Sequence, residues 1–245
     1  MSELFSIQLQ NRQQQGRDGV WLDLPTTTEQ VQAALRQIGI SSDNPQGLFI
    51  SGYFAEEEKR FAISYNMVLA SNVDELNFLA SRLETLSTGE RAELNAALQA
   101  PQSELSSIGR ITDFPENVDY YVHLPDVHGP AQLGDYYLNR SGMVDMPEEW
   151  KGGIDTAQFG RYVTQQEQGA FTQYGYLVKS GDEWQKVYEG QPVPEEYRVL
   201  SFPASEILRD AANIPPPVQS TTEQQQVIPT VSYTHLRAHE TPEHL

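Results

Sequence analysis

The chain has 245 residues, with 34 Asp and Glu against 16 Lys and Arg, so its formal net charge at pH 7 is −18. The absence of cysteine excludes disulfides, thiolate catalysis and cysteine-ligated metal centres. The charge disfavours contact with nucleic acid or anionic lipid, and no apolar run approaches the roughly 18 residues of a membrane span, which predicts a cytoplasmic protein.

Residues 1–67 are predicted to form a small α+β domain that begins with a hairpin. Apolar and polar residues alternate over 4–9 and again over 20–24. This period of two is typical of strands that are buried on one face. The polar stretch between the two segments supplies the turn.

A helix is predicted after this hairpin, followed by two more strands. Thr26 with Glu29 fits a capping box, and apolar residues then recur at helical spacing until Gly39. Short apolar segments at 47–54 and 61–65 surround a charged turn, which indicates two further strands.

Residues 68–145 are predicted to form a mainly helical middle domain. Asn72 with Glu75 and Ser87 with Glu90 are two further capping-box patterns, each leading into apolar residues at helical spacing. We therefore expect a helical hairpin, followed by short mixed elements between prolines and glycines.

Residues 146–205 are predicted to form a second α+β domain. Asp155 is a suitable N-cap for a helix. The segments 174–179 and 183–188 flank a Ser-Gly-Asp turn, which indicates a hairpin, and 197–202 is the candidate for a third strand.

Residues 206–245 have the composition of a linker rather than of a folded domain. They include three consecutive prolines and a Gln/Thr-rich run. Three of the five histidines lie in the last 11 residues, and residues 232–245 resemble a read-through of a cloning adapter. We interpret this end as non-native and exclude it from functional reasoning.

The sequence carries no recognisable catalytic, nucleotide-binding or metal-binding motif. The serine-nucleophile elbow, the phosphate-binding loop and the dinucleotide fingerprint are all absent. His123, Asp126 and His128 could in principle hold a divalent ion, but Pro125 and Gly129 favour a solvated loop. We expect no cofactor, no metal and no enzymatic activity.

The negative charge is concentrated in the middle of the chain. Residues 68–145 hold twelve acidic and four basic residues. One interpretation is that these carboxylates only keep the protein soluble. The other is that they imitate the phosphates of DNA, which follow one another at about 3.4 Å along each strand; on an ideal helix, Glu90 and Glu93 are about 4.5 Å apart along the axis.

Three blocks of the sequence resemble ArdA-type antirestriction proteins of mobile elements and occur in the same order as in that family. The blocks are 19–40, 73–86 and 117–137, within a resemblance that covers roughly 3–203. The most specific piece is the Asp-Glu-Leu-Asn helix start at 74–77. None of the blocks is a catalytic signature.

This resemblance implies a fold, a function and partners. It implies an elongated α+β chain of three small domains, in which α+β units flank the mainly helical one. It also implies a homodimer that mimics bent B-form DNA and occupies the DNA-binding groove of type I restriction-modification enzymes, against their specificity and methyltransferase subunits. Both restriction and modification would then be blocked.

The resemblance transfers site residues only as acidic candidates for partner binding. They are Asp74, Glu75, Glu84, Glu90, Glu93, Glu104, Asp113, Glu116, Asp119, Asp126 and Asp135. The alternative to mimicry is an acidic interaction or regulatory module of a mobile element. A dimer contact is expected in the C-terminal segment, which offers the aromatic residues Tyr174, Tyr176, Trp184 and Tyr188. The alternative is that these residues pack each hairpin onto its own helix.

Overall fold

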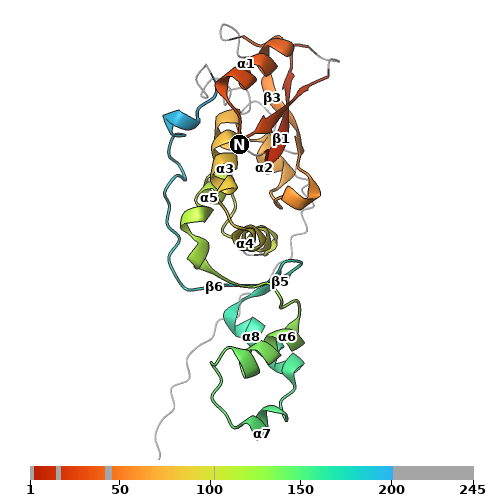
Figure 1. Cartoon of the computed structure of the whole chain (residues 1–245), viewed down its shortest axis with the longest axis vertical. Helices are drawn as coiled ribbons and strands as arrows, with labels where there is room; N and C mark the ends of the chain where they lie inside the picture. Colours follow the sequence, from red (N-terminus) through yellow and green to blue (C-terminus); the bar gives the residue numbers. More distant parts are fainter. Residues whose placement is uncertain (1–2, 15–17, 42–45, 102, 201–245) are drawn as a thin grey trace, which may run out of the picture. The chain divides into compact units, whose positions relative to one another are not determined.

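The computed structural model describes residues 3–14, 18–41, 46–101 and 103–200, all within one compact unit, Met1–Asn213. In this part of the chain, helices combine with two antiparallel three-stranded sheets into an α+β fold, as the sequence predicts (Figure 1). The predicted tail lies outside the described residues. The predicted domain boundaries at 67 and 145 stay predictions.

The first sheet has the strand order β2-β1-β3, with β1 (Phe5–Asn11) in the centre. The hairpin partner of β1 is β2 (Val20–Leu24), and its other neighbour is β3 (Leu48–Phe54), so both predicted segments are confirmed as strands. Alternate residues of β1 are buried, because one face of the sheet packs on the core.

Helix α1 (Thr28–Gln37) begins with a capping box, one residue later than the predicted one. Thr27 is the N-cap, and its hydroxyl accepts a hydrogen bond from the backbone amide of Gln30. Thr26 is buried instead, and its backbone amide donates to Oδ1 of Asn77 at 2.7 Å. This long-range contact ties the amide of Thr26 to another helix, and the capping box forms at the next threonine.

Residues 61–65 do not form the predicted strand, although their inward side chains are buried as a strand would require. The hydrogen bonds of this segment go to a side chain. Asn95, on helix α4 (Thr88–Gln99), accepts from the amide of Ala62 at 2.7 Å and donates to the carbonyl of Arg60 at 3.3 Å. A buried asparagine thus replaces the neighbouring strand.

The other two predicted capping boxes are confirmed. Asn72 and Glu75 cap α3 (Val73–Glu84) with reciprocal hydrogen bonds, and Ser87 and Glu90 cap α4 in the same way. In each box the N-cap side chain and the glutamate satisfy two backbone amides that the helix leaves unpaired. The start of each helix is therefore predictable from a stretch of four residues.

The second sheet has the order β4-β6-β5 and joins segments that are distant in sequence. It consists of β4 (Tyr121–Leu124), β6 (Gly175–Lys179) and β5 (Ala170–Thr172). Helix α4 packs against β4 and β6, while α3 packs against α5 (Ile108–Thr112) and β2. The two helices of the predicted helical hairpin thus pack mainly against different elements.

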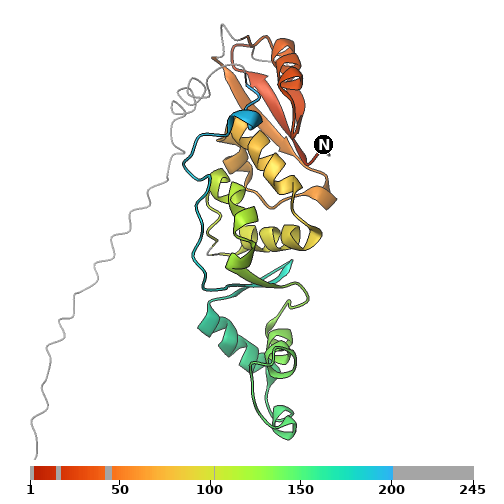
Figure 2. The ribbon, with the colours of Figure 1, turned by 60° about the vertical axis from the view of Figure 1, so that its left-hand side comes forward.

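The predicted hairpin of 174–179 with 183–188 does not form, because β4 and β5 already occupy both edges of β6. Residues 183–188 belong instead to a segment that we call the strap, residues 180–200. The strap returns past α5 and α3 (Figure 2). Its only regular element is the 3-10 helix η5 (Glu195–Tyr197), so the strand predicted at 197–202 is also wrong within the described residues.

Buried polar side chains hold the backbone of the strap. Asn117 pairs with Gln185 through two hydrogen bonds: its Oδ1 accepts from the amide at 2.7 Å, and its Nδ2 donates to the carbonyl at 2.9 Å. Nδ2 of Asn77 donates to the carbonyl of Tyr197 at 3.0 Å. These contacts take the place of a strand ladder.

Two helices near the second sheet approach each other through glycines. Gly134 of α6 (Pro130–Asp135) faces Gly160 of α8 (Thr156–Glu167), which starts at Asp155 as predicted. A Cβ atom on Gly134 would lie 1.9 Å from the carbonyl oxygen of Thr156. Any side chain at this position would force the two helices apart.

Short elements connect these larger ones. Most are single turns whose amides bond to carbonyls three residues earlier. Those described are η1 (Glu57–Lys59), α2 (Tyr65–Leu69), η2 (Phe114–Glu116), η3 (Val118–Tyr120), the π-helix η4 (Tyr136–Arg140) and α7 (Glu148–Lys151).

One cluster of buried apolar side chains runs from β1 through α3, α4 and α5 to β6. The first sheet and the predicted middle domain therefore share a core. A smaller cluster, formed by Val127, Leu133 and Tyr176, lies between α6 and the second sheet. Within the described residues, no helix combines the length and the apolar character needed to cross a membrane.

Candidate partner-binding surface

Three of the predicted acids come together around α4. Glu90 and Glu93 lie one turn apart on this helix, and Asp119, on η3, lies close enough for its charge to act on Glu93. Asp119 is exposed, and the two glutamates are half-buried. We call these three residues the acidic triad. Proximity of Glu90 and Glu93 follows from helix geometry, whereas the position of Asp119 depends on the tertiary fold.

The triad holds Glu93 in an unfavourable electrostatic environment. Burial, followed by the charges of Glu90 and Asp119, raises the pKa of Glu93 to about 8. Its Oε1 atom is buried and has no hydrogen-bond partner among the described residues. The pKa of Glu90 is lowered instead, because Ser87 donates hydrogen bonds to its carboxylate. Every charged group that shifts the pKa of Glu93 is another carboxylate.

Three other predicted acids form ion pairs within the chain, and one of them, Asp135, pairs with Arg140 at 2.8 Å. Glu104 pairs with Lys179 and with Arg110, each at 2.6 Å, and the hydrogen bond from Lys179 is the largest cause that lowers its pKa. Glu116 pairs with Arg82. Because their charges are compensated within the chain, these three acids offer less negative potential to a partner than the triad does.

Asp74 and Asp113 serve the fold instead of the surface. Both are buried, and both accept hydrogen bonds from backbone amides of the strap. Asp74 binds the amides of Val199 and Leu200 at 2.8 and 2.9 Å, and its burial raises its pKa. Asp113 accepts hydrogen bonds from the backbone amides of Tyr188 and Glu189. The proposed partner surface therefore excludes these two residues.

Asp135 and the remaining three candidates lie apart from the triad in the sequence. Glu75 is half-buried at the start of α3, and Glu84 is half-buried at its end. Asp126 is exposed in the loop after β4. Asp135 accepts hydrogen bonds from Asn139 and Arg140, which lower its pKa.

Further exposed acids, which the sequence pattern did not single out, lie in the C-terminal part of the described chain. Eight acidic residues of this part are exposed. They are Asp145, Glu148, Glu149, Asp155, Asp182, Glu183, Glu195 and Glu196. The excess of acidic over basic residues in this segment was the available signal, but the candidate list followed the peak of charge in the middle.

The possible metal ligands around residue 125 do not converge. The Nε2 atom of His123 contacts the carbonyl oxygen of Tyr174 at 2.7 Å. Asp126 and His128 are exposed in the loop that follows. Among the residues with described positions, no group of three His, Cys, Asp or Glu side chains is arranged to hold a metal ion.

The aromatic residues expected at a dimer contact pack inside the chain. Tyr176 is fully buried, so its assignment to an interface is wrong for this fold. Tyr188 packs edge-on against Phe78 with ring centroids 4.9 Å apart, and Trp184 packs against Tyr120 at 5.1 Å. Large exposed apolar residues nearby in the sequence are Met143, Trp150 and Tyr162.

A family model with the description "Antirestriction protein (ArdA)" matches residues 15–178 of this chain. The match includes the whole acidic triad and all eleven predicted acids. No curated protein matches the chain.

Proposed function

Since the chain belongs to the ArdA family of antirestriction proteins, we propose that it is a non-enzymatic inhibitor that mimics B-form DNA. It occupies the DNA-binding groove of a type I restriction-modification enzyme, between the specificity and methyltransferase subunits. Competition for this groove blocks both restriction and modification. The proposed architecture is three small domains in an elongated homodimer.

The acidic triad is the observation that carries this proposal. The fold places Glu93 beside two other carboxylates although this arrangement raises its pKa. A carboxyl group whose pKa is raised by burial and by specific charged neighbours is more typical of a functional site than of an ordinary surface position. A cationic groove would relieve this repulsion, because its Lys and Arg side chains favour the ionised form of all three acids.

Each acid of the partner surface contributes little binding free energy by itself, and tight binding requires many of them together. Exposed ion pairs contribute only about 0 to 1 kcal/mol each, so a DNA mimic depends on many of them. Twelve acidic residues lie between 68 and 145. Among the described residues, five of these are buried or paired within the chain: Asp74, Glu104, Asp113, Glu116 and Asp135.

Neutralising the triad by Glu90→Gln, Glu93→Gln and Asp119→Asn is expected to weaken binding to a type I methyltransferase about tenfold at low salt. Each single change should cost fivefold or less. The measurement is a competition titration against a labelled DNA duplex at several salt concentrations. The affinity of the wild type should fall as salt rises, because salt screens the ion pairs.

The matched control removes three exposed acids from the N-terminal part by Glu3→Gln, Asp18→Asn and Glu57→Gln. It removes at least as much negative charge as the triad variant does, since Glu93, with a pKa of about 8, is largely protonated at neutral pH, and it should alter affinity less than twofold. An equal loss in the control would assign inhibition to total charge instead of to the triad. Failure of the wild type to displace DNA at low salt would leave the alternative, an acidic interaction or regulatory module of a mobile element.

Trp150→Ala is expected to shift the proposed homodimer toward monomer. Trp150 and Met143 are 68% and 75% exposed, and such large apolar side chains are typical anchors of an interface. Light scattering at micromolar concentration should give twice the 27.6 kDa chain mass for the wild type. Trp21→Ala is the control, because Trp21 is also half-exposed but lies on β2; a monomeric wild type would refute the dimer.

A further inference from the structure

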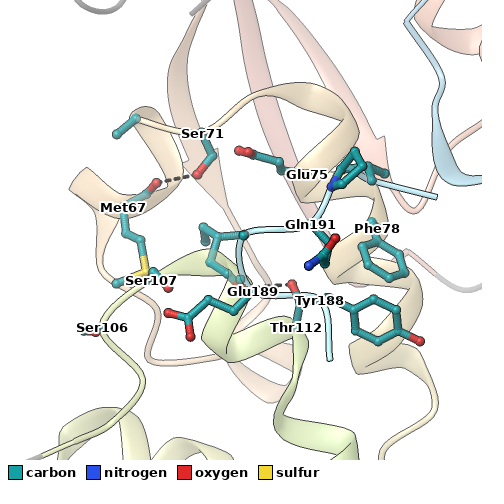
Figure 3. Close-up of a pocket in the computed structure, with 16 residues that line it drawn as sticks. Met67, Ser71, Glu75, Phe78, Ser106, Ser107, Thr112, Tyr188, Glu189 and Gln191 are labelled. Carbon is teal, nitrogen blue, oxygen red and sulfur yellow. Dashed lines mark hydrogen bonds between the residues drawn. The ribbon is translucent and has the colours of Figure 1, made fainter. Parts of the chain in front are cut away.

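A pocket of about 600 Å³ lies beneath the strap (Figure 3). None of the residues that line it belongs to the acidic triad. Its walls come from α2, from the start of α3, from α5 and from strap residues 188–193. This volume is within the range of small-molecule sites. Nothing in the proposed mimicry requires a cavity here.

The pocket has an apolar side that suits a hydrocarbon stem. Phe78 and Tyr188 pack edge-on at 4.9 Å and form one part of the lining, and Met67 and Val193 add aliphatic surface. Phe78 is only 4% exposed, and its ring packs against the rings of Tyr188 and Tyr197 in the strap. A short apolar group would be desolvated against these side chains.

The polar side of the pocket is anionic. Its two charged groups are Glu75 and Glu189. Glu189 is already paired with Arg110 at 3.0 Å and with Lys186 at 3.4 Å. One oxygen of Glu75 accepts from the backbone amide of Asn72 at 3.2 Å, and no ion pair of the described residues includes Glu75.

We propose that this pocket binds a guanidinium or ammonium group carried on a short apolar stem. Glu75 accepts the hydrogen bonds of the cation, the hydroxyl groups of Ser71 and Ser107 line the same cavity, and Phe78 contacts the stem. A charge-assisted hydrogen bond to a carboxylate supplies specificity for the cation over a neutral group. Glu75 also disfavours an anion, whereas Glu189 contributes less negative potential because Arg110 and Lys186 compensate its charge.

Two sources could supply this chemistry. One is a free alkyl amine or guanidine. The other is an Arg or Lys side chain of the inhibited enzyme, and this second source rests on the proposed function. The binding of a free probe tests the pocket without reference to inhibition.

The probe is n-butylguanidinium, and n-butylurea is its neutral isostere. An NMR titration of the full chain should show backbone shifts at residues of α3, α5 and the strap that line the pocket. The wild type should bind n-butylguanidinium at least tenfold more tightly than n-butylurea. Glu75→Gln should reduce this preference to about twofold or less, because it removes the charge.

The comparison rests on a conservative substitution and on a matched control. Glutamine can occupy the same capping-box position, so α3 should keep its start and the thermal unfolding of the variant should match the wild type. Glu90→Gln is the matched control, since Glu90 has the same capping-box role on α4 but does not line the pocket. It should keep the full preference for the cation.

Equal affinity of the wild type for the two probes, or an unchanged preference in Glu75→Gln, would overturn the proposal. The source is identified in the methyltransferase competition assay. If the pocket receives a side chain of the enzyme, n-butylguanidinium weakens inhibition by the wild type but not by Glu75→Gln. If it receives a free amine, the probe binds and inhibition is unchanged. A chain that binds the probe but never inhibits would refute the proposed function alone.

Discussion

Replacing Asp113 by alanine is expected to lower the free energy of unfolding by about 3 kcal/mol or more. Asp113 is fully buried, and its two oxygens accept hydrogen bonds from the amides of Tyr188 and Glu189 at 2.6 and 3.3 Å. Alanine would leave both amides without their acceptor. Urea denaturation monitored by circular dichroism measures the loss.

Two further variants show whether the cause is the anchoring of the strap. Asp113→Asn keeps one carbonyl oxygen that can accept one of the two bonds, so it should cost less than alanine does. Asp126→Ala removes an exposed carboxylate and should change stability by less than about 0.5 kcal/mol. An Asp113→Ala protein as stable as the wild type would show that the strap does not depend on this contact.

Glu93→Gln is expected to stabilise the protein at alkaline pH by about 2 kcal/mol or more. The pKa of Glu93 is raised from its ordinary value of 4.5 to about 8 in the folded state. The folded state therefore binds this proton more tightly than the unfolded state does. The resulting stabilisation is fully present below pH 4.5 and is lost as pH rises to 8, whereas glutamine stays neutral throughout.

The measurement is the difference in unfolding free energy between Glu93→Gln and the wild type from pH 4.5 to 9. It should grow with pH and level off above pH 8. Asp119→Asn removes one of the charges that raise the pKa of Glu93, so it should move the transition to lower pH. Asp126→Asn is the control. A difference that does not change with pH would show that Glu93 ionises normally.

Substitutions of Asp113 and of Glu93 are expected to change stability in opposite directions. Asp113 is a buried acid that the fold satisfies with backbone donors, and its removal costs stability. Glu93 is a partly buried acid without such donors at Oε1, and its neutralisation restores stability. If the fold keeps the destabilising Glu93 carboxyl group because this group contributes to binding, Glu93→Gln should gain stability and lose affinity for the cationic partner.

Elements with local causes were predictable from the sequence. The boxes at Asn72 with Glu75 and at Ser87 with Glu90 use residues three apart, so neither depends on the rest of the chain. The hairpin of β1 and β2 follows from alternation on two adjacent segments. The α+β class and the family resemblance rest on the same contiguous blocks.

Elements whose hydrogen-bond partners are distant were not predictable in this way. The segment 61–65 has the pattern of a strand, but Asn95 supplies its partner from 33 residues away. Residues 183–188 also have a strand pattern, but β4 takes the edge of β6 that they would need. Periodicity reports which side chains are buried, and it does not report which backbone lies beside them.

The acidity of the chain, the peak of acids in its middle and the starts of α3 and α4 all follow from the order of the amino acids alone. What each acid does depends on the folded arrangement. The fold buries Asp74 and Asp113 against the strap, pairs Glu104 and Glu116 with cations, and exposes Glu93 to the charges of Glu90 and Asp119. A carboxylate has the same charge in every sequence position, but its energy depends on burial and on neighbours that the fold alone assembles.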